Sequence, residues 1–385
     1  MSQLPADLIR AEATRLGSIS FDRYLELALY SPQGFFNRGR GVGHDFRTSP
    51  HVGPLFGAIV ARAIDREWRL LGEPDPFVVV EVGAGNGRLA KEVLRASPEC
   101  AKALRYVLVE ISDALRAEQH DHLSIEPPEE ALGPCEIVDA DGAPELVALT
   151  GPIVTSLSEL PATSIEGIVL ANELLDNLVF GLAEFDGEKF LEVRVGPNLE
   201  QMRVPLANPG AVEAFMALGD VHIDAGSTVP MPNGINSFFE EASRLLRRGS
   251  MILIDYCVEA NELLNRGNGW LRTYREQVRG NDPFLFPGEV DITADVVVEH
   301  VEAAATACGF GRIERTSQAS WLSDLGIHDL VEEGTRIWES KASNPDIGAL
   351  EAKSRASQAA ILLDQSSVAS LGNFTVFTTS TTRRS

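Results

Sequence analysis

The sequence has few basic residues and no long apolar run. Its 33 Lys and Arg residues stand against 56 Asp and Glu residues, which leaves a formal net charge of −23 over 385 residues. Nucleic-acid binding depends on clustered cations, so this balance argues against a nucleic-acid partner. No stretch of 18 consecutive apolar residues occurs, and we therefore expect no membrane span.

Cysteine is also scarce, and the four that occur show no CxxC spacing: Cys100, Cys135, Cys257 and Cys308. This pattern is typical of free thiols in a reducing compartment. The N-terminal residues lack the apolar stretch of a secretory signal, so we expect a cytoplasmic protein. His44 and His51 have no recognisable third ligand nearby, which argues against a metal site.

Strand and helix patterns alternate from residue 76 onward. Apolar runs predict strands at 77–83, 105–111, 135–141, 165–173 and 249–257, with helical segments after the first two. Continuous apolar runs suit strands that are buried on both faces. Strands separated by helices indicate an α/β fold with a doubly wound, mostly parallel sheet.

The remaining segments differ in their hydrophobic periodicity, and these differences suggest the domain boundaries. Helical periodicity dominates residues 1–72, which we expect to form a helical N-terminal layer. We expect the core to comprise residues 73–180 and 231–385, with an insertion at 181–230 between them. The insertion contains a segment of alternating character, whose Asp186-Gly187 pair predicts a hairpin turn. A polar stretch over 259–294 predicts a loop or lid.

The first predicted strand runs into the glycine turn Gly83-x-Gly85-x-Gly87. A dinucleotide site needs a small residue where Arg88 stands, so a nicotinamide oxidoreductase is disfavoured. The spacing fits the turn of class I S-adenosylmethionine (SAM) methyltransferases better. Glu81 supplies a carboxylate at the end of the strand, where we expect it near the cationic amino group of SAM.

Two further acids extend this cofactor hypothesis. Glu110 ends the second predicted strand, where a carboxylate can accept hydrogen bonds from both ribose hydroxyls. Asp139 ends the segment that we predict to be the third strand, a position suited to contact with an adenine amino group. The alternative is that the glycines only form a tight turn and the acids are surface residues.

The fourth predicted strand ends in Asn172, Glu173 and Asp176. If a helix opens there, Glu173 and Asp176 lie on one face, as a bidentate clamp for a guanidinium. The alternative is that Asn172 caps this helix and the acids complement its dipole. Thr48, Ser49 and Pro50 also allow two interpretations. They form a kinked, hydroxyl-bearing loop with a role at the site, or they only cap the helix that follows.

Taken together, these motifs resemble the MidA/NDUFAF7-like family of class I SAM-dependent methyltransferases. The segments that carry the resemblance are "ISFDRYLELALYSPQGFF", "DFRTSPHVGPLFG", "VVEVGAGNGRLAKEVL", "YVLVEISDALRAEQ", "ANELLDNL", "GSMILIDYC", "LRTYREQ", "PGEVDITADV" and "SQASWLSDLGI". The resemblance implies a seven-stranded Rossmann-like sheet, a helical N-terminal layer that covers the cofactor site, and an insertion that shapes the substrate cleft.

The resemblance also assigns site residues. On the cofactor side it matches Gly83, Gly85, Gly87, Glu110 and Asn172. In a loop that folds over the cofactor it matches Asp45, Thr48, Ser49 and Pro50. On the substrate side it matches Glu173, Asp176, Asp291 and Thr293, of which the first three are our candidate catalytic residues.

This chain departs from the family pattern at the N-terminal loop, where His44 replaces a glycine and His51 replaces an acid. The resemblance implies SAM as cofactor, S-adenosylhomocysteine as product, and methyl transfer to a protein side-chain nitrogen, with arginine favoured. The loss of the acid puts arginine specificity in question. Small-molecule methylation and a non-catalytic SAM-binding assembly role are the alternatives, and a homodimer is a further hypothesis.

Overall fold

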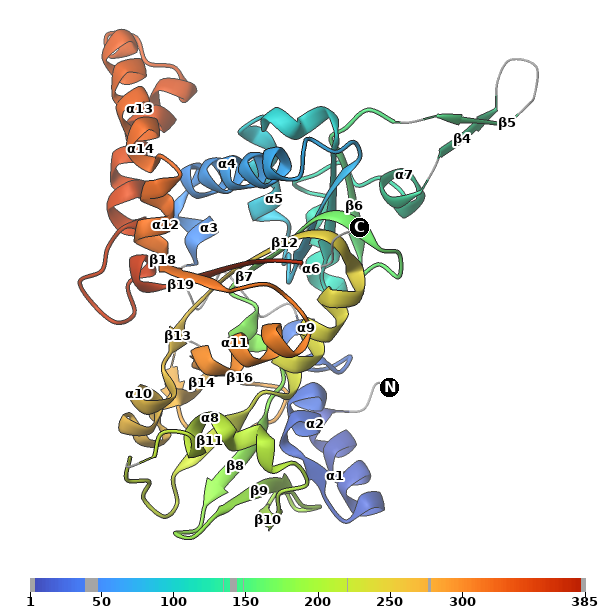
Figure 1. Cartoon of the computed structure of the whole chain (residues 1–385), viewed down its shortest axis with the longest axis vertical. Coiled ribbons are helices and arrows are strands. Elements are labelled where there is room, and N and C mark those ends of the chain that lie inside the picture. The colour runs from blue at the N-terminus through green and yellow to red at the C-terminus, as the bar shows by residue number, and fades with distance from the viewer. Residues whose placement is uncertain are drawn as a thin grey trace. The chain divides into compact units, whose positions relative to one another are not determined.

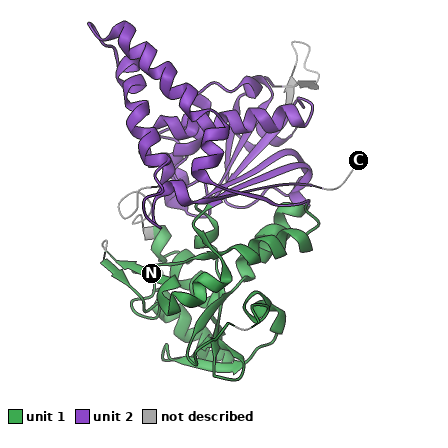
Figure 2. Cartoon of the chain, turned by 60° about the vertical axis from the view of Figure 1, so that its left-hand side comes forward, with its two compact units in different colours: residues 1–46, 173–243, 255–310 green, residues 47–172, 244–254, 311–385 purple. Residues whose placement is uncertain are grey.

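The computed structural model describes residues 4–38, 48–133, 135–138, 144–147, 149–219, 221–275 and 278–381. The chain divides into two compact units, which Figure 2 colours separately. Unit 1 comprises residues 1–46, 173–243 and 255–310, and unit 2 comprises 47–172, 244–254 and 311–385.

Unit 2 contains a seven-stranded sheet with the strand order β18-β19-β12-β7-β2-β3-β6 (Figure 1). The strands are β2 (Phe77–Val82), β3 (Leu104–Val109), β6 (Ile153–Leu157), β7 (Ile165–Asn172), β12 (Leu246–Asp255), β18 (Glu314–Ser317) and β19 (Thr375–Ser380). The run from β12 to β6 is parallel, and β18 is antiparallel to β19. The predicted mostly parallel α/β sheet is confirmed.

Helices connect and flank these strands. They are α3 (Ser49–Val52), α4 (Pro54–Leu70), α5 (Arg88–Arg95), α6 (Asp113–Gln119), α7 (Pro128–Leu132), α12 (Gln318–Asp324), α13 (Ile327–Lys341) and α14 (Ile347–Leu362), with short 3-10 turns η3 (Glu99–Lys102) and η7 (Leu371–Asn373). A Cβ on Gly57 of α4 would lie 2.4 Å from the Glu92 Cβ of α5, so the glycine allows these helices to pack closely. Figure 1 shows α13 and α14 as a hairpin that extends away from the sheet.

The predicted third strand of this sheet is wrong. The segment at 135–141 contributes β4 (Cys135–Val138), which pairs with β5 (Pro144–Val147) in a separate two-stranded ribbon. The strand beside β3 is β6. The sequence between β4 and β5 contains Asp141-Gly142, a hairpin signal that favours local pairing over insertion into the sheet.

Unit 1 is built on a second sheet, in which β1 (Ile19–Ser20) pairs with the insertion. The insertion supplies β8 (Gly181–Phe185), β9 (Phe190–Val195), β10 (Gln201–Pro205) and β11 (Thr228–Met231). All its pairs are antiparallel. The predicted hairpin at Asp186-Gly187 is confirmed, since it joins β8 to β9.

The other elements of unit 1 surround this sheet. They are α1 (Pro5–Leu16), α2 (Phe21–Leu25), the π-helix η1 (Glu26–Tyr30), η2 (Phe35–Arg38), η4 (Leu175–Asn177), η5 (Pro209–Val212), α8 (Glu213–Met216), α9 (Asn233–Leu245), α10 (Ala260–Asn265), η6 (Gly267–Trp270) and α11 (Val298–Ala307). The core includes large aromatic side chains, of which Phe21, Tyr24 and Trp270 are fully buried. The Tyr24 hydroxyl and the Trp270 indole each donate to a backbone carbonyl, so their polar atoms are satisfied in the core.

The stretch 259–294 that we predicted as a loop or lid is largely ordered secondary structure. Besides α10 and η6 it contains β14 (Leu271–Arg275), β15 (Val278–Gly280) and β16 (Asp291–Ala294), which form a three-stranded antiparallel sheet. A two-stranded parallel ribbon joins β13 (Cys257–Val258) to β17 (Val296–Val297). Leu271, Ile292 and Ala294 are buried, so these short strands are stabilised by packing rather than by a long apolar run.

No helix among the described residues is long and apolar enough to cross a membrane. The two units divide the chain at places other than our predicted boundaries. Residues 1–46 group with the insertion in unit 1, whereas α4 groups with the large sheet in unit 2. The helical layer over 1–72 as a cover for the cofactor site stays a prediction.

Candidate active site

The glycine turn follows the carboxyl end of β2. The backbone N–H groups of Gly83 and Ala84 both donate to the Val109 carbonyl, at 2.9 and 3.1 Å. Gly83, Gly85 and Gly87 have φ angles of 72°, 54° and 79°. A side chain costs roughly 1–2 kcal/mol in this left-handed region, so the loop favours glycine at all three positions.

Gly85 is fixed by hydrogen bonds on its N–H and its carbonyl. Its N–H donates to Glu110 Oε2 at 2.9 Å, and its carbonyl accepts from Gln119 Nε2 at 2.7 Å. Gln119 in turn accepts from the Ser156 hydroxyl at 2.6 Å, which ties the loop to β6. A Cβ built on Gly85 would meet nothing within 4 Å, so the loop backbone faces open space that a ligand can approach.

Glu110 directly follows β3 and is 8% exposed. Its two carboxylate oxygens accept the N–H groups of Gly85 and Ser112. Burial raises the pKa of Glu110, and these two backbone donors oppose the rise. Each carboxylate oxygen has a further lone pair, so Glu110 can still accept hydrogen bonds from a ribose diol. The position fits the predicted role.

Glu81 lies within β2 and is 4% exposed. The Tyr106 hydroxyl donates to Glu81 Oε2 at 2.7 Å. Burial raises the pKa of Glu81 to about 8, and the bond from Tyr106 lowers it. A carboxyl group with this pKa is mostly protonated at pH 7, and a nearby cation would favour its ionised form.

The N-terminal loop residues lie at the start of α3. Thr48 occupies the N-cap position but makes no side-chain cap bond. Thr48 Oγ1 instead lies 2.5 Å from His51 Nδ1, and the buried Ser49 hydroxyl donates to Gln318 Oε1 at 3.1 Å. The pKa of His51 is lowered by burial and by the charge of Arg88. The predicted residues Asp45 and Asp139, and also His44, lie outside the described residues.

Asn172 is the last residue of β7, and the helix that we predicted to open after it is absent. The chain instead makes the single 3-10 turn η4, with Glu173 at φ 55°. A non-glycine residue in the left-handed region is strained, and such residues cluster at functional sites. Because Asn172 belongs to a strand, the prediction of Asn172 as a helix cap is wrong.

Asp255 holds this turn in place, and our sequence reasoning missed it. Its Oδ2 accepts the N–H groups of Leu175 at 2.7 Å and Asp176 at 3.4 Å, and its Oδ1 accepts the N–H of Tyr256 at 2.7 Å. Asp255 is 1% exposed. Burial raises its pKa well above the ordinary range, and the charges of Asp176 and Glu173 add to the rise. The available signal was an acid that ends the apolar run "SMILID".

Asp176 is joined to β16. Its Oδ2 accepts the Thr293 hydroxyl at 3.0 Å, and its Oδ1 accepts the Asn177 amide at 2.8 Å. Burial raises the pKa of Asp176, and Thr293 and Arg272 oppose the rise. Asp291 is also buried and lies two residues before Thr293, hence on the same face of β16.

The structure therefore brings the predicted residues together in two groups. Gly83, Gly85, Gly87 and Glu110 form a connected set in unit 2, and Glu173, Asp176 and Thr293 gather around Asp255 in unit 1. Within the described ranges, no cluster of three His, Cys, Asp or Glu side chains could hold a metal ion.

A parallel α/β sheet with a glycine loop after one strand and a buried carboxylate after its neighbour is typical of proteins that bind a nucleoside cofactor. A family profile described as "Putative S-adenosyl-L-methionine-dependent methyltransferase" matches residues 59–314. The chain belongs to this family. It is a SAM-dependent methyltransferase, and SAM is its cofactor.

Three relatives illustrate the similarity. "Protein arginine methyltransferase NDUFAF7 homolog, mitochondrial" of Drosophila melanogaster is 28% identical over 77% of this chain and 69% of its own length. The Mus musculus protein arginine methyltransferase NDUFAF7 is 25% identical over 81% and 71%. A crystal structure from Burkholderia thailandensis, bound to S-adenosyl-homocysteine, is 28% identical, covers 98% of this chain and 91% of its own, and has a TM-score of 0.74.

Proposed function

We propose that this methyltransferase acts on a side-chain nitrogen of another protein and that the acceptor residue is arginine. The observation that carries the proposal is the acidic turn of unit 1, Glu173 to Asp176, whose backbone is bonded to the buried Asp255 and whose two carboxylates raise the pKa of Asp255. Relatives named as protein arginine methyltransferases support it. An unmethylated guanidinium is a planar cation that carboxylates bind in bidentate geometry.

Hydrogen bonds orient Asp176 for this role. Thr293 and Asn177 each occupy one of its oxygens, and each oxygen keeps a lone pair for an acceptor N–H. Asp255 fixes the backbone beneath the turn, so the carboxylates are held before any acceptor arrives. Holding a nucleophile in line with the reacting carbon supplies much of the rate of a displacement reaction.

The bound cofactor supplies a methyl group on a positively charged sulfur. As the acceptor nitrogen forms its bond to this carbon, the carbon–sulfur bond breaks and its electron pair stays on sulfur, which gives S-adenosylhomocysteine. The nitrogen must also lose a proton, and Asp176 takes it in our proposal. Burial raises the pKa of Asp176, which makes it a stronger base than an exposed aspartate.

On the cofactor side, we assign the ribose diol to Glu110 and the close backbone approach to Gly85. Asn172 and the loop residues Asp45, Thr48, Ser49 and Pro50 stay predicted cofactor contacts. Since β6 rather than β4 lies beside β3, an acid for the adenine amino group belongs after β6. Glu159 stands two residues beyond its end.

The test is methyl transfer from labelled SAM to extracts of cells that lack the protein, followed by amino-acid analysis of the labelled bands. Methylarginine in a protein is expected. Label confined to small molecules, or to another amino acid, would reject arginine as the acceptor. A cytoplasmic location and a homodimer also remain predictions, which cell fractionation and light scattering can check. The Drosophila melanogaster and Mus musculus relatives are named as mitochondrial.

A further inference from the structure

The single 3-10 turn η4 is held from outside at both of its ends. At its start, Asp255 Oδ2 accepts the N–H groups of Leu175 and Asp176. At its end, the Tyr30 hydroxyl donates to the Asn177 carbonyl at 2.5 Å. So short a turn leaves most of its backbone polar groups without a partner inside the turn. Its conformation therefore depends on these two contacts.

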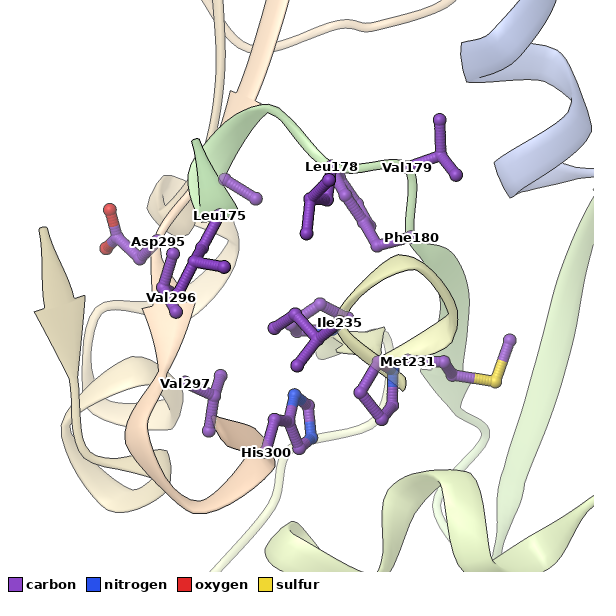
Figure 3. Close-up of a pocket in the computed structure, with 13 residues that line it drawn as sticks. Leu175, Leu178, Val179, Phe180, Met231, Ile235, Asp295, Val296, Val297 and His300 are labelled. Atoms are coloured by element: carbon purple, nitrogen blue, oxygen red, sulfur yellow. The ribbon is translucent and has the colours of Figure 1, made fainter. Parts of the chain in front are cut away.

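Apolar packing fixes the depth of this turn but not the direction of its carboxylate. Leu175 is 4% exposed and lines a mainly apolar pocket together with Leu178, Val296 and Val297 (Figure 3). The hydrophobic effect has no directional preference, whereas hydrogen bonds require a defined geometry. The direction in which Asp176 points is therefore set by hydrogen bonds.

Asn177 connects the Tyr30 contact to the carboxylate of Asp176. Its side-chain amide donates to Asp176 Oδ1 at 2.8 Å and to the Glu173 carbonyl at 3.3 Å. Glu173 has a φ angle of 55°, a conformation that persists only where the surrounding contacts fix it. A shift of the Asn177 backbone would therefore move the group that orients Asp176.

Tyr30 is itself held in place. It is the last residue of the π-helix η1, and π-helical turns are frequent at functional sites. Its ring stacks on Phe36 with centroids 5.3 Å apart, and its carbonyl accepts the Asn37 amide at 3.0 Å. The hydroxyl therefore reaches Asn177 from a ring whose backbone and side chain are both fixed.

The purely structural explanation is that Tyr30 only satisfies its own hydroxyl. Tyr24 of the same N-terminal segment does this, since its hydroxyl donates to the Pro283 carbonyl, also at 2.5 Å. Pro283 lies outside the acidic turn, whereas Asn177 carries the amide that holds Asp176. This difference between the two acceptor residues points to a role for Tyr30 in the reaction, and it makes Tyr24 a matched control.

We propose that Tyr30 is a positioning residue for methyl transfer, which fixes the acidic turn through the Asn177 carbonyl and thereby directs the Asp176 carboxylate toward the acceptor. The inference rests on the proposed function, in which Asp176 takes the proton. It gives the N-terminal segment a role on the acceptor side of the reaction.

Tyr30→Phe tests the proposal, because phenylalanine keeps the stacked ring and removes only the hydroxyl. Total label transferred from SAM to proteins in extracts of cells that lack this protein is measured over a range of SAM concentrations. We expect the maximal rate to fall about tenfold while the KM for SAM stays the same, since a misdirected catalytic group slows the displacement. Tyr24→Phe should lose similar stability and keep the wild-type rate. An undiminished rate in Tyr30→Phe, or an equal loss in Tyr24→Phe, would overturn the proposal.

A double-mutant cycle tests whether Tyr30 acts through Asn177. Asn177→Ala removes the amide that holds Asp176 and keeps the backbone carbonyl. Adding Tyr30→Phe to Asn177→Ala should then lower the rate by no more than about twofold further. A further loss of about tenfold in the double variant would mean that the two residues act independently, and the proposal would be wrong.

A spectroscopic measurement gives a readout without turnover. The full-length protein is labelled with ¹³C at the carboxyl carbon of its aspartate side chains, and Asp176→Asn identifies the Asp176 resonance by its loss. We expect this resonance to shift in Tyr30→Phe and to keep its position in Tyr24→Phe. An Asp176 resonance that does not move in Tyr30→Phe would contradict the proposal.

The outcomes for Tyr30 and for the acceptor can be told apart because total label is counted. Label on a residue other than arginine, with a reduced rate in Tyr30→Phe, would reject the acceptor and leave the role of Tyr30 standing. Label on arginine at an undiminished rate in Tyr30→Phe would do the reverse.

Discussion

The Tyr106 hydroxyl donates a 2.7 Å hydrogen bond to Glu81 Oε2 inside the parallel sheet. Tyr106 is fully buried and Glu81 nearly so. Burial raises the pKa of Glu81 from 4.5 to about 8. The folded protein therefore holds a proton at neutral pH that the unfolded chain releases near pH 4.5.

This proton predicts how stability depends on pH. Between pH 4.5 and about 8 the folded state binds more protons at Glu81 than the unfolded state, so the free energy of unfolding falls as pH rises and levels off above pH 8. The contribution is on the order of several kcal/mol. Urea denaturation across this range checks it. Glu81→Gln should show a clearly shallower decline than the wild type, and an equal slope in both proteins would disprove the assignment.

Gly85→Ala tests whether the space beside the glycine loop is where SAM binds. The added methyl group meets no protein atom within 4 Å at φ 54°, so the protein alone loses only about 1–2 kcal/mol of stability. The methyl group would occupy the space where we place SAM, and calorimetry should show at least a tenfold loss of affinity. Gly17→Ala is the matched control, because Gly17 also has positive φ and open space around it. The Gly17→Ala variant should lose about as much stability as Gly85→Ala, while its affinity for SAM stays that of the wild type.

Glu110→Gln tests the ribose assignment. The amide keeps the size of the side chain but loses the charge that strengthens hydrogen bonds from hydroxyl groups. We expect SAM affinity to fall by about ten- to a hundredfold, since hydrogen bonds to charged groups contribute about 1.5–3 kcal/mol. Glu118→Gln, an exposed change on α6, serves as the control. Unchanged calorimetric affinity in Glu110→Gln would remove Glu110 from the cofactor site.

Asp176→Asn tests the proton acceptor. The amide oxygen can still accept the Thr293 hydroxyl, but the side chain can no longer take a proton, so kcat should fall by about a hundredfold or more. SAM affinity should not change. Because the base acts only when ionised, wild-type activity should be lost as pH falls through the raised pKa of Asp176, and the variant should lack this step. Glu188→Gln, an exposed change in the β8–β9 hairpin, should behave like the wild type in rate and pH profile.

Much of the large sheet could be predicted from the sequence for one physical reason. Strands β2, β3, β7 and β12 are buried on both faces, so the sequence of each contains a mostly apolar run. The glycine loop could also be predicted, since the positive φ angles of its backbone favour glycine over other residues. Strand β6 was not predicted because it is short and contains Thr155 and Ser156. Such residues usually suggest a turn, but here their hydroxyls donate hydrogen bonds to neighbouring segments.

The acidic turn shows why local patterns failed at the site itself. The spacing of Glu173 and Asp176 predicted a helix, but Asp255 accepts the Leu175 N–H and holds the chain in a single 3-10 turn. Asp255 lies about 80 residues later in the sequence, so no local pattern could reveal this contact.

The most direct test of the central claim is transfer of a labelled methyl group from SAM to protein arginine by the purified protein. Extracts of cells lacking the protein serve as substrate, and Asp176→Asn serves as the inactive comparison. We predict labelled methylarginine in at least one protein with the wild type and little or none with the variant. Undiminished labelling by the variant, or label on a residue other than arginine, would contradict the account.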